Sequence, residues 1–241
     1  MTTYSTETNT IQRTCADCGQ EYMHEPMIVG GLDLLGRVKI CQPCSDQAEQ
    51  EDDRIKREEK ARAAWEASVP VGYRKTEIDH PDFPKKLHEQ CKLWLIDRSE
   101  NRKLCLGLVG ESGRGKSRVI SQLAKRIIWR GEDLHWVNSA QFQWAAQHQF
   151  SDADGRAAAG WLRSYRKARV LVFDDIGSLK GTEAVSEALY SLLEYRTTRE
   201  MPILWSSNET IGEMLPGSKI TDLARKRVLS RLGGFSNIIE L

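Results

Sequence analysis

The chain has 241 residues, enough for an α/β core and one small additional module, and its 35 basic side chains nearly balance 34 acidic ones. This balance excludes a molecule-wide positive field, so any contact with nucleic acid must come from local patches. No segment approaches eighteen consecutive apolar residues, and the N-terminus lacks the basic and apolar regions of a signal peptide. We therefore expect a cytoplasmic protein that does not contact membranes.

Residues 1–45 contain two CxxC pairs, Cys15 with Cys18 and Cys41 with Cys44, separated by 22 residues. A reducing compartment favours thiolate metal ligands over disulfides. Two such pairs can place four thiolates around Zn²⁺, as in zinc ribbons. A redox motif and coincidental pairs are the alternatives, although a redox motif normally lies in a βαβ context that is missing here. The sequence predicts a zinc-ribbon-like module, and its lack of excess positive charge favours a protein partner over DNA.

Residues 46–67 mix charges of both signs with alanine and contain no glycine or proline, which predicts a solvated helical linker. Pro70 ends this pattern, and the following stretch, which is rich in proline, is expected to be extended. We place the domain boundary near residue 68. The remaining cysteines, Cys91 and Cys105, fall on an apolar helix face and in a core strand, where buried unreactive thiols are the usual finding.

Predicted helices and strands alternate over residues 68–241. Strands are expected at 103–110, 134–138, 169–173, 201–208 and 235–241, and helices at 86–97, 117–131, within 140–167, around 185–193 and at 220–232. Parallel strands joined by helical crossovers form a sheet that is covered on both faces. The predicted fold class is therefore α/β, with the small module and the helical linker preceding the sheet.

The sequence GESGRGKS, Gly110 to Ser117, fits the pattern GxxxxGK[ST], with a predicted strand before it and a predicted helix after it. Glycines allow backbone N–H groups to surround phosphate oxygens, and the helix adds its positive N-terminal end. Lys116 is expected to reach the β and γ phosphates of ATP, and the Ser117 hydroxyl to bind Mg²⁺. The expected nucleotide-binding residues are Gly110, Glu111, Ser112, Gly113, Arg114, Gly115, Lys116, Ser117, Arg118 and Asp174.

Two adjacent acids, Asp174 and Asp175, follow the apolar strand VLVF. In proteins with a phosphate-binding loop of this kind, an acid at the end of a neighbouring strand helps to hold Mg²⁺. We expect Asp174 to have this role and Asp175 to polarise the attacking water. Asn208, which ends another strand, is placed to bond the γ phosphate or that water. Each of these residues could instead be an ordinary turn residue.

The four sequences GESGRGKS, VLVFDDIG, WSSNE and RVLSRLGG resemble, in order and spacing, the AAA+ ATPases of the initiator branch. The resemblance is greatest to bacterial helicase loaders of the DnaC and DnaI type and to their relative, the IstB transposition helper. It covers residues 68–241 and implies a five-stranded parallel sheet and ATP sites shared between protomers of an ATP-dependent homo-oligomer. Only ten residues follow Arg231, which leaves no room for the helical lid of most AAA+ proteins and suggests weak hydrolysis by the protein alone.

The resemblance also assigns two arginines. Arg231 matches the family's arginine finger, which stabilises charge in the neighbouring protomer's site, and Arg196 resembles a second arginine acting in the same way. The alternative for both is a surface arginine favoured by the dipole at a helix C-terminus. In the DnaI-type loaders an N-terminal zinc module binds the hexameric replicative helicase, so the layout of this chain implies the same partner.

Aromatic and basic side chains alternate between residues 142 and 167, a composition typical of grooves that bind single-stranded DNA. The candidate contacts are Trp144, Arg163, Tyr165, Arg166 and Lys167. The aromatic rings could equally belong to the core. The leading hypothesis is an ATP-dependent helicase loader for replication initiation. The alternatives are an ATPase helper of DNA transposition and an adaptor that ATP switches without being hydrolysed.

Overall fold

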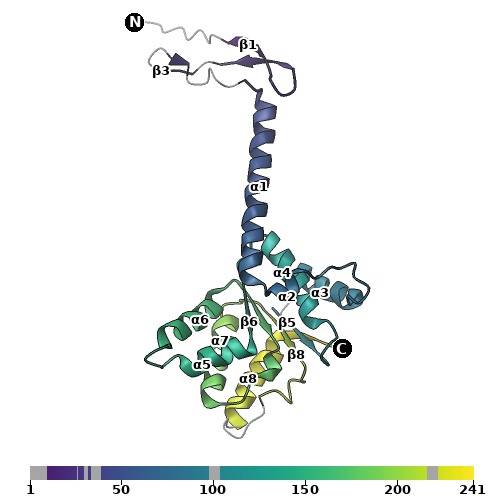
Figure 1. Ribbon diagram of the computed structural model, residues 1–241, viewed down its shortest axis with the longest axis vertical. Coiled ribbons are helices and arrows are strands. Elements are labelled where there is room, and N and C mark those ends of the chain that lie inside the picture. The colour runs from purple at the N-terminus through teal and green to yellow at the C-terminus, as the bar shows by residue number, and fades with distance from the viewer. Residues whose placement is uncertain (1–9, 26, 30–31, 34–38, 98–103, 216–221) are drawn as a thin grey trace. The chain divides into compact units, whose positions relative to one another are not determined.

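The computed structural model describes residues 10–25, 27–29, 32–33, 39–97, 104–215 and 222–241 (Figure 1). The chain forms two compact units, Met1–Glu59 and Lys60–Leu241. The boundary between them falls inside helix α1 (Gln42–Ser68), which contains the helix predicted over residues 46–67. Pro43 is the second residue of α1, where a missing backbone N–H costs nothing.

The smaller unit is built from two short antiparallel pairs of strands. β1 (Ile11–Thr14) pairs with β2 (Glu21–His24), and β3 (Ile28–Val29) pairs with β4 (Leu32–Asp33). Among the side chains that the structure describes in this unit, the buried ones are Cys15, His24 and Cys41. An apolar core of this size does not stabilise a fold by itself, so such a unit needs additional cross-links or a metal.

The larger unit contains one sheet of five parallel strands, as the sequence predicts. The strands are β5 (Cys105–Val109), β6 (Leu134–Asn138), β7 (Val170–Asp174), β8 (Ile203–Ser207) and β9 (Ser236–Glu240), and their order in the sheet is β6-β7-β8-β5-β9. All four neighbouring pairs are parallel. Parallel pairing requires crossover segments, which the helices between the strands provide.

Helices cover both faces of this sheet (Figure 1). They are α3 (Lys85–Asp97), α4 (Lys116–Trp129), α5 (Ser139–His148), α6 (Gly155–Lys167), α7 (Glu183–Thr197) and α8 (Asp222–Phe235). The side chains of strand β7 alternate between the apolar cores on the two faces of the sheet. Val170 and Val172 pack with α3 and α4, whereas Leu171 and Phe173 pack with α5 to α8, because successive strand residues point to opposite faces.

Two segments differ from the sequence prediction. The helical region 140–167 consists of two helices, α5 and α6, with Gln149 to Asp154 between them. The stretch after Pro70 was expected to be extended, but Val71–Arg74 form a short helix, α2. Pro70 stands directly before this helix and lacks the N–H that a helix start leaves unpaired, so proline marks a new helix here rather than an extended segment.

Parallel strands place the sequence motifs at one edge of the sheet. The loop after β5, the acids at the end of β7 and the polar end of β8 all lie at the carboxyl ends of adjacent strands, since β8 pairs with both β5 and β7. This edge is where ligands bind in open α/β sheets. Among the helices in the described ranges, none is both long enough and apolar enough to cross a membrane.

Candidate functional site: a nucleotide pocket and a cysteine cluster

The loop between β5 and α4 turns through three glycines with positive φ: Gly110 at 149°, Gly113 at 83° and Gly115 at 82°. A side chain at Gly115 would also collide with Pro84, whose Cγ lies 2.8 Å from the position of an added Cβ. Helix α4 then begins at Lys116 without a side-chain cap, so its first backbone N–H groups are available to an anion. The loop is therefore shaped to surround a phosphate.

Lys116 is buried, and three oxygens hold its ammonium group. Its Nζ donates to the carbonyl oxygens of Gly110 at 2.6 Å and Glu111 at 2.8 Å, and to Asn208 Oδ1 at 2.8 Å. Burial lowers the pKa of Lys116, and the charges of the two nearby acids oppose this effect. A lysine that is partly desolvated and surrounded by neutral acceptors can turn to a phosphate at low cost.

Asp174, the last residue of β7, is buried and accepts two short hydrogen bonds on one oxygen. Ser117 Oγ donates to Asp174 Oδ1 at 2.8 Å, and Ser206 Oγ donates to the same oxygen at 2.6 Å. The serine at the start of α4 and the acid of β7 are therefore in direct contact. A hydroxyl and a carboxylate in contact at the end of a phosphate-binding loop suit Mg²⁺, which prefers oxygen ligands and the phosphates of its nucleotide.

Asp175 has a left-handed backbone with φ of 58°, and hydrogen bonds fix both its main chain and its side chain. Its amide donates to Ser206 Oγ at 2.8 Å, and its carbonyl oxygen accepts from Ser139 Oγ. Its carboxylate accepts from Asn208 Nδ2 at 3.2 Å and from Ser178 Oγ. A non-glycine residue in this conformation persists only where its surroundings determine it, as they do here.

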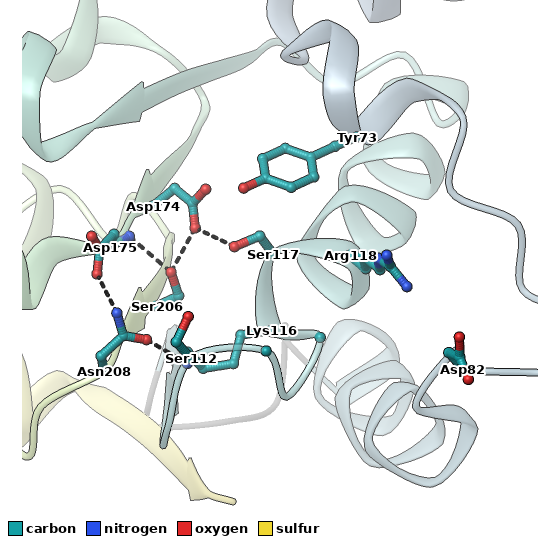
Figure 2. A pocket seen from close by; sticks show the side chains of 12 residues that line it. Tyr73, Asp82, Ser112, Lys116, Ser117, Arg118, Asp174, Asp175, Ser206 and Asn208 are labelled. Atoms are coloured by element: carbon teal, nitrogen blue, oxygen red, sulfur yellow. Dashed lines mark hydrogen bonds between the residues drawn. The ribbon is translucent and has the colours of Figure 1, made fainter.

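These residues line one cavity of about 580 Å³ (Figure 2). Its lining consists of Tyr73, Asp82, Ser112, Gly113, Gly115, Lys116, Ser117, Arg118, Asp174, Asp175, Ser206 and Asn208. Three residues of the predicted nucleotide set do not line it, namely Gly110, Glu111 and Arg114. Arg114 instead forms an exposed ion pair with Glu111 at 3.0 Å. Mg²⁺ would bind at Ser117 and Asp174 and neutralise phosphate charge.

Three lining residues were missed from the sequence, namely Ser206, Tyr73 and Asp82. Ser206 belongs to the polar end of β8 that carries Asn208, so its place in the strand was a usable signal. Tyr73 and Asp82 lie in the segment before α3, where no pattern in the sequence points to a ligand. Only the packing of this segment beside α4 brings them to the cavity.

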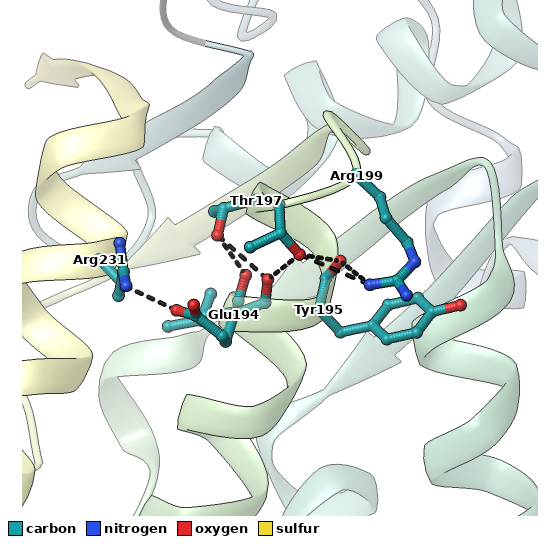
Figure 3. Close-up of polar contacts among 7 residues, drawn as sticks. Glu194, Tyr195, Thr197, Arg199 and Arg231 are labelled. Carbon is teal, nitrogen blue, oxygen red and sulfur yellow. Dashed lines mark hydrogen bonds and ion pairs between the residues drawn. The ribbon is translucent and has the colours of Figure 1, made fainter.

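Arg231 lies on α8 and is not among the residues that line the nucleotide cavity. Its Nε forms an ion pair with Glu194 Oε2 on α7 at 2.8 Å, and 38% of its side chain is exposed (Figure 3). Its guanidinium also lies 6.0 Å from the centre of the Phe235 ring. With Lys226 and Arg227 it lines a second cavity, of about 510 Å³. Because Arg231 is partly exposed and lies among other cationic side chains, its position is compatible with the predicted action on a neighbouring protomer.

Arg196 is fully buried, which conflicts with its predicted action on a neighbouring protomer. Its guanidinium donates to five backbone carbonyl oxygens, those of Tyr165, Arg166, Ala168, Arg169 and Pro202. The contact to Pro202 and that to Ala168 are each 2.7 Å. Burial lowers the pKa of Arg196 to about 10, so it stays charged at neutral pH. Arg196 fastens the loops before β7 and β8, and we withdraw its assignment as a second trans-acting arginine.

Of the candidate DNA contacts, one is buried in the core and the others are at least partly exposed. Tyr165 is buried, with 3% of its surface exposed, and packs on Phe142 and His135, so it belongs to the core and not to a DNA groove. Trp144 is half-buried and packs against Trp161 with ring centres 5.0 Å apart. Arg163 and Lys167 are exposed, whereas Arg166 is half-buried and donates to Ser191 Oγ at 2.8 Å.

The four N-terminal cysteines converge at one point of the smaller unit. The Sγ atoms of Cys15, Cys18, Cys41 and Cys44 all lie within 4.8 Å of one another, and those of Cys18 and Cys41 are 3.7 Å apart. A tetrahedral zinc ion with Zn–S bonds of about 2.3 Å separates its sulfur ligands by roughly 3.8 Å, so the cluster could hold zinc.

The four thiols are close enough to change one another's pKa values. Hydrogen bonds from the amides of Cys18 and Cys41 lower the pKa of Cys15 to about 6, and the Cys41 amide lies 3.3 Å from Cys15 Sγ. Hydrogen bonding with the Cys41 and Cys18 thiols raises the pKa of Cys44. By contrast, burial raises the pKa of Cys91 to about 12 and that of Cys105 to about 11, as expected of unreactive core thiols.

Comparisons with known proteins identify an ATP-binding family. A family model described as IstB-like ATP binding protein matches residues 70–233. An ATP-binding protein of an insertion sequence of Mycobacterium tuberculosis is 28% identical over 176 residues, which span 67% of this chain and 64% of that protein. The chain therefore covers less than two thirds of that relative's length.

Two solved structures share the fold of the larger unit. The structure of DnaI has a TM-score of 0.59 at 19% identity and is matched over 71% of this chain and 94% of its own. The structure of the DnaC helicase loader has a TM-score of 0.53 at 16% identity, with 71% and 99% of the two chains covered. At these identities the similarity establishes the fold alone.

Proposed function

The chain belongs to the IstB-like ATP-binding proteins, and from this premise we propose that it is an ATP-dependent helicase loader that delivers a hexameric replicative helicase onto single-stranded DNA. Membership in an ATP-binding family is consistent with ATPase activity, and the cavity contains the groups that such chemistry needs. Two parts of the proposal go beyond family membership, namely the helicase as the protein partner and single-stranded DNA as the nucleic acid.

The observation that carries this proposal is the four-cysteine cluster in a unit of its own, ahead of the nucleotide-binding unit. Among the described residues of this unit, the buried ones are too few to form an enzyme core, and a zinc ion at the cluster would stabilise the unit. A small separate unit that precedes an ATPase in the chain suits the binding of a protein partner. We propose that the cysteine unit, residues 1–45, binds the helicase, that residues 46–67 link the two parts, and that residues 68–241 form the ATPase.

In the ATPase unit we propose that two neighbouring protomers both contribute residues to each ATP site. Within a protomer, Lys116 and the loop bind the phosphates, Ser117 and Asp174 bind Mg²⁺, and Asp175 with Asn208 orients the attacking water. Arg231 reaches the site of the next protomer in an ATP-dependent homo-oligomer. Support comes from the partial exposure of Arg231 and from its absence among the residues that line its own chain's nucleotide cavity. Its charge would stabilise the transferring phosphate.

For single-stranded DNA we propose the exposed face formed by α5 and α6. Trp161 is 44% exposed and packs on Trp144, and Arg163 and Lys167 are exposed on the same helix as Trp161. Aromatic rings beside cations can stack bases and contact phosphates without sequence preference. Tyr165 is no longer part of this group.

A second candidate function is supported by the mycobacterial relative, which is described as part of an insertion sequence. On this alternative the protein would be an ATPase helper of DNA transposition and would act on double-stranded target DNA. The cysteine cluster would then bind a component of the transposition machinery. The two functions share the nucleotide site and differ in the partner.

The test mixes the full-length protein with the replicative helicase of its host, with and without Mg²⁺·ATP, and weighs the complexes by native mass spectrometry. We expect a complex that is lost in the double variant Cys41→Ser/Cys44→Ser and kept in Cys91→Ala, which changes a thiol outside the cluster. We expect Lys116→Ala to abolish any dependence of the complex on ATP.

Absence of a helicase complex, together with binding to double-stranded DNA, would move the assignment to transposition. A complex in which ATP is never hydrolysed would instead identify an ATP-switched adaptor.

A further inference from the structure

The four-residue helix α2 contacts both the nucleotide cavity and the C-terminal end of α1. It lies between the end of α1 and the start of α3, and two of its adjacent residues have different contacts. Tyr73 lines the nucleotide cavity, whereas Arg74 binds the end of α1. A helix this short has little stability by itself, so these contacts determine where it lies.

Tyr73 reaches the part of the cavity where Mg²⁺ is expected. Its ring stacks on that of Trp136 in β6, with ring centres 5.5 Å apart and an angle of 27° between the planes. Figure 2 shows its hydroxyl directed toward Ser117 and Asp174, across the space above the start of α4. Burial, and to a smaller extent the charge of Asp174, raises the pKa of Tyr73, so the hydroxyl keeps its proton and can donate a hydrogen bond at neutral pH.

Arg74 holds the last turn of α1. Its Nε donates to the carbonyl oxygen of Val69 at 2.6 Å, and its Nη2 donates to that of Glu66. The last carbonyl groups of a helix have no partners within the helix, and a cation there also interacts favourably with the helix dipole. Trp65 and Val69 at this end of α1 are buried in the core that also contains Trp136. The end of α1 is therefore fixed to the same core as the Tyr73 stack.

We propose that Tyr73 is a positioning residue that senses Mg²⁺·nucleotide, and that Arg74 transmits its movement to the C-terminal end of α1. This inference rests on the proposed use of the cavity for Mg²⁺·ATP. A Mg²⁺ ion held by Ser117 and Asp174 would change the charge in front of the Tyr73 hydroxyl, and this hydroxyl would then donate a hydrogen bond to the bound Mg²⁺·nucleotide. Because Tyr73 and Arg74 are neighbours in one turn, a shift of the first displaces the second from its two carbonyl groups.

The consequence is a defined route from the nucleotide to α1. The helix that ends at Ser68 is the one that contains Cys44 as its third residue. Nucleotide-dependent change at the end of α1 is thus a means by which ATP can regulate the part of the chain that we propose binds the partner. Nothing in the phosphate-binding loop, the acids or Arg231 supplies this function.

The test combines nucleotide affinity with hydrogen–deuterium exchange of the full-length protein. ATP is titrated once with MgCl₂ and once with EDTA, and exchange is followed in peptides that cover residues 65–75. In the wild type we expect saturating Mg²⁺·ATP, but not ATP in EDTA, to change exchange in this segment. In Tyr73→Phe we expect affinity for Mg²⁺·ATP to fall roughly tenfold, the size typical of a lost hydrogen bond to a charged group, while affinity in EDTA stays within about twofold.

Two further variants separate sensing from transmission. Arg74→Lys keeps the charge but cannot bond two carbonyl groups in a fixed geometry, so we expect normal affinities and no nucleotide response at the end of α1. Tyr195→Phe removes a hydroxyl outside the cavity and should behave as the wild type. Equal affinities of Tyr73→Phe and the wild type in both titrations would overturn the role of Tyr73. Normal Mg²⁺·ATP binding without a wild-type exchange response would overturn the coupling alone, whereas a wild type that binds no ATP would overturn the nucleotide site as well.

Discussion

The two acids at the end of β7 have different hydrogen-bond partners. Asp174 is bonded to the hydroxyl of Ser117, the second residue of helix α4 after the phosphate-binding loop. Asp175 is bonded to the amide of Asn208 and to Ser178, and it does not contact Ser117 through any of the hydrogen bonds that the structure describes. Asp174 therefore contacts the serine that we propose as a Mg²⁺ ligand, and Asp175 is held beside Asn208, which we propose to orient water.

This difference predicts two separable defects. Asp175→Asn should keep affinity for Mg²⁺·ATP within about threefold and lower the single-turnover rate of hydrolysis by roughly 100-fold or more, because the group that accepts the proton is lost. Asp174→Asn should weaken binding of Mg²⁺·ATP but not of ATP in EDTA. The measurements are a fluorescent nucleotide titration and a single-turnover ATPase assay. Loss of binding in both variants alike would contradict the assignment.

Sequence patterns identified most residues of this pocket because they are fixed by local chemistry. The loop from Gly110 to Ser117 needs glycines at defined places, and the acids must follow a buried strand. Tyr73 could not be assigned in the same way, and the polar end of β8 did not by itself single out Ser206. Serine at a strand end and tyrosine in a turn are common, and only the pairing of β8 with β7 and the packing of α2 bring them to the cavity.

At the scale of elements, α7 carries a buried arginine and an exposed ion pair on different faces. Glu194 pairs with Arg231 of α8 (Figure 3). Arg196, two residues later, is buried and donates to backbone carbonyl groups that precede β7 and β8. A position near a helix C-terminus suggested an exposed arginine at Arg196. Arg196 instead lies on the face of α7 that packs against the core, and packing determines which face that is.

Arg196 should therefore matter for stability and not for communication between protomers. Arg196→Leu leaves carbonyl groups buried without a donor, and we expect it to lower the free energy of unfolding by about 3 kcal/mol or more. The exposed neighbour Arg199, which stacks on Tyr195, provides the matched control, and Arg199→Leu should change it by less than about 0.5 kcal/mol. Urea denaturation followed by circular dichroism measures both. A fully stable Arg196→Leu protein with impaired oligomer ATPase would restore the trans-acting role.

At the scale of the whole molecule, the chain consists of two units whose stability has different origins. The larger unit buries two apolar cores on the faces of its sheet. The smaller unit has few buried side chains in its described part and brings four thiols together. Metal-binding energy on the order of 10 kcal/mol would dominate the stability of a unit of this kind.

We accordingly expect one equivalent of zinc per chain, measured by native mass spectrometry and elemental analysis. Removing it with a chelator should abolish protection from hydrogen exchange in residues 10–45, while the larger unit keeps its protection and its affinity for ATP measured after Mg²⁺ is restored. Cys18→Ser should reproduce this effect, and Cys91→Ala should retain the metal. Loss of ATP binding together with the zinc would show instead that the two units fold as one.

The sequence by itself determined the α/β class, the five parallel strands, the phosphate-binding loop and the cysteine pairs, because each depends on local periodicity or on fixed spacing along the chain. Tertiary structure alone decided that Arg196 and Tyr165 are buried, that residues 71–74 are helical, and that Tyr73 lines the same cavity as Ser117 and Asp174. These properties depend on which face of an element meets the rest of the protein. Burial of arginine and tyrosine becomes favourable only when packing supplies carbonyl oxygens or apolar neighbours from distant segments, and a single sequence does not state which segments those are.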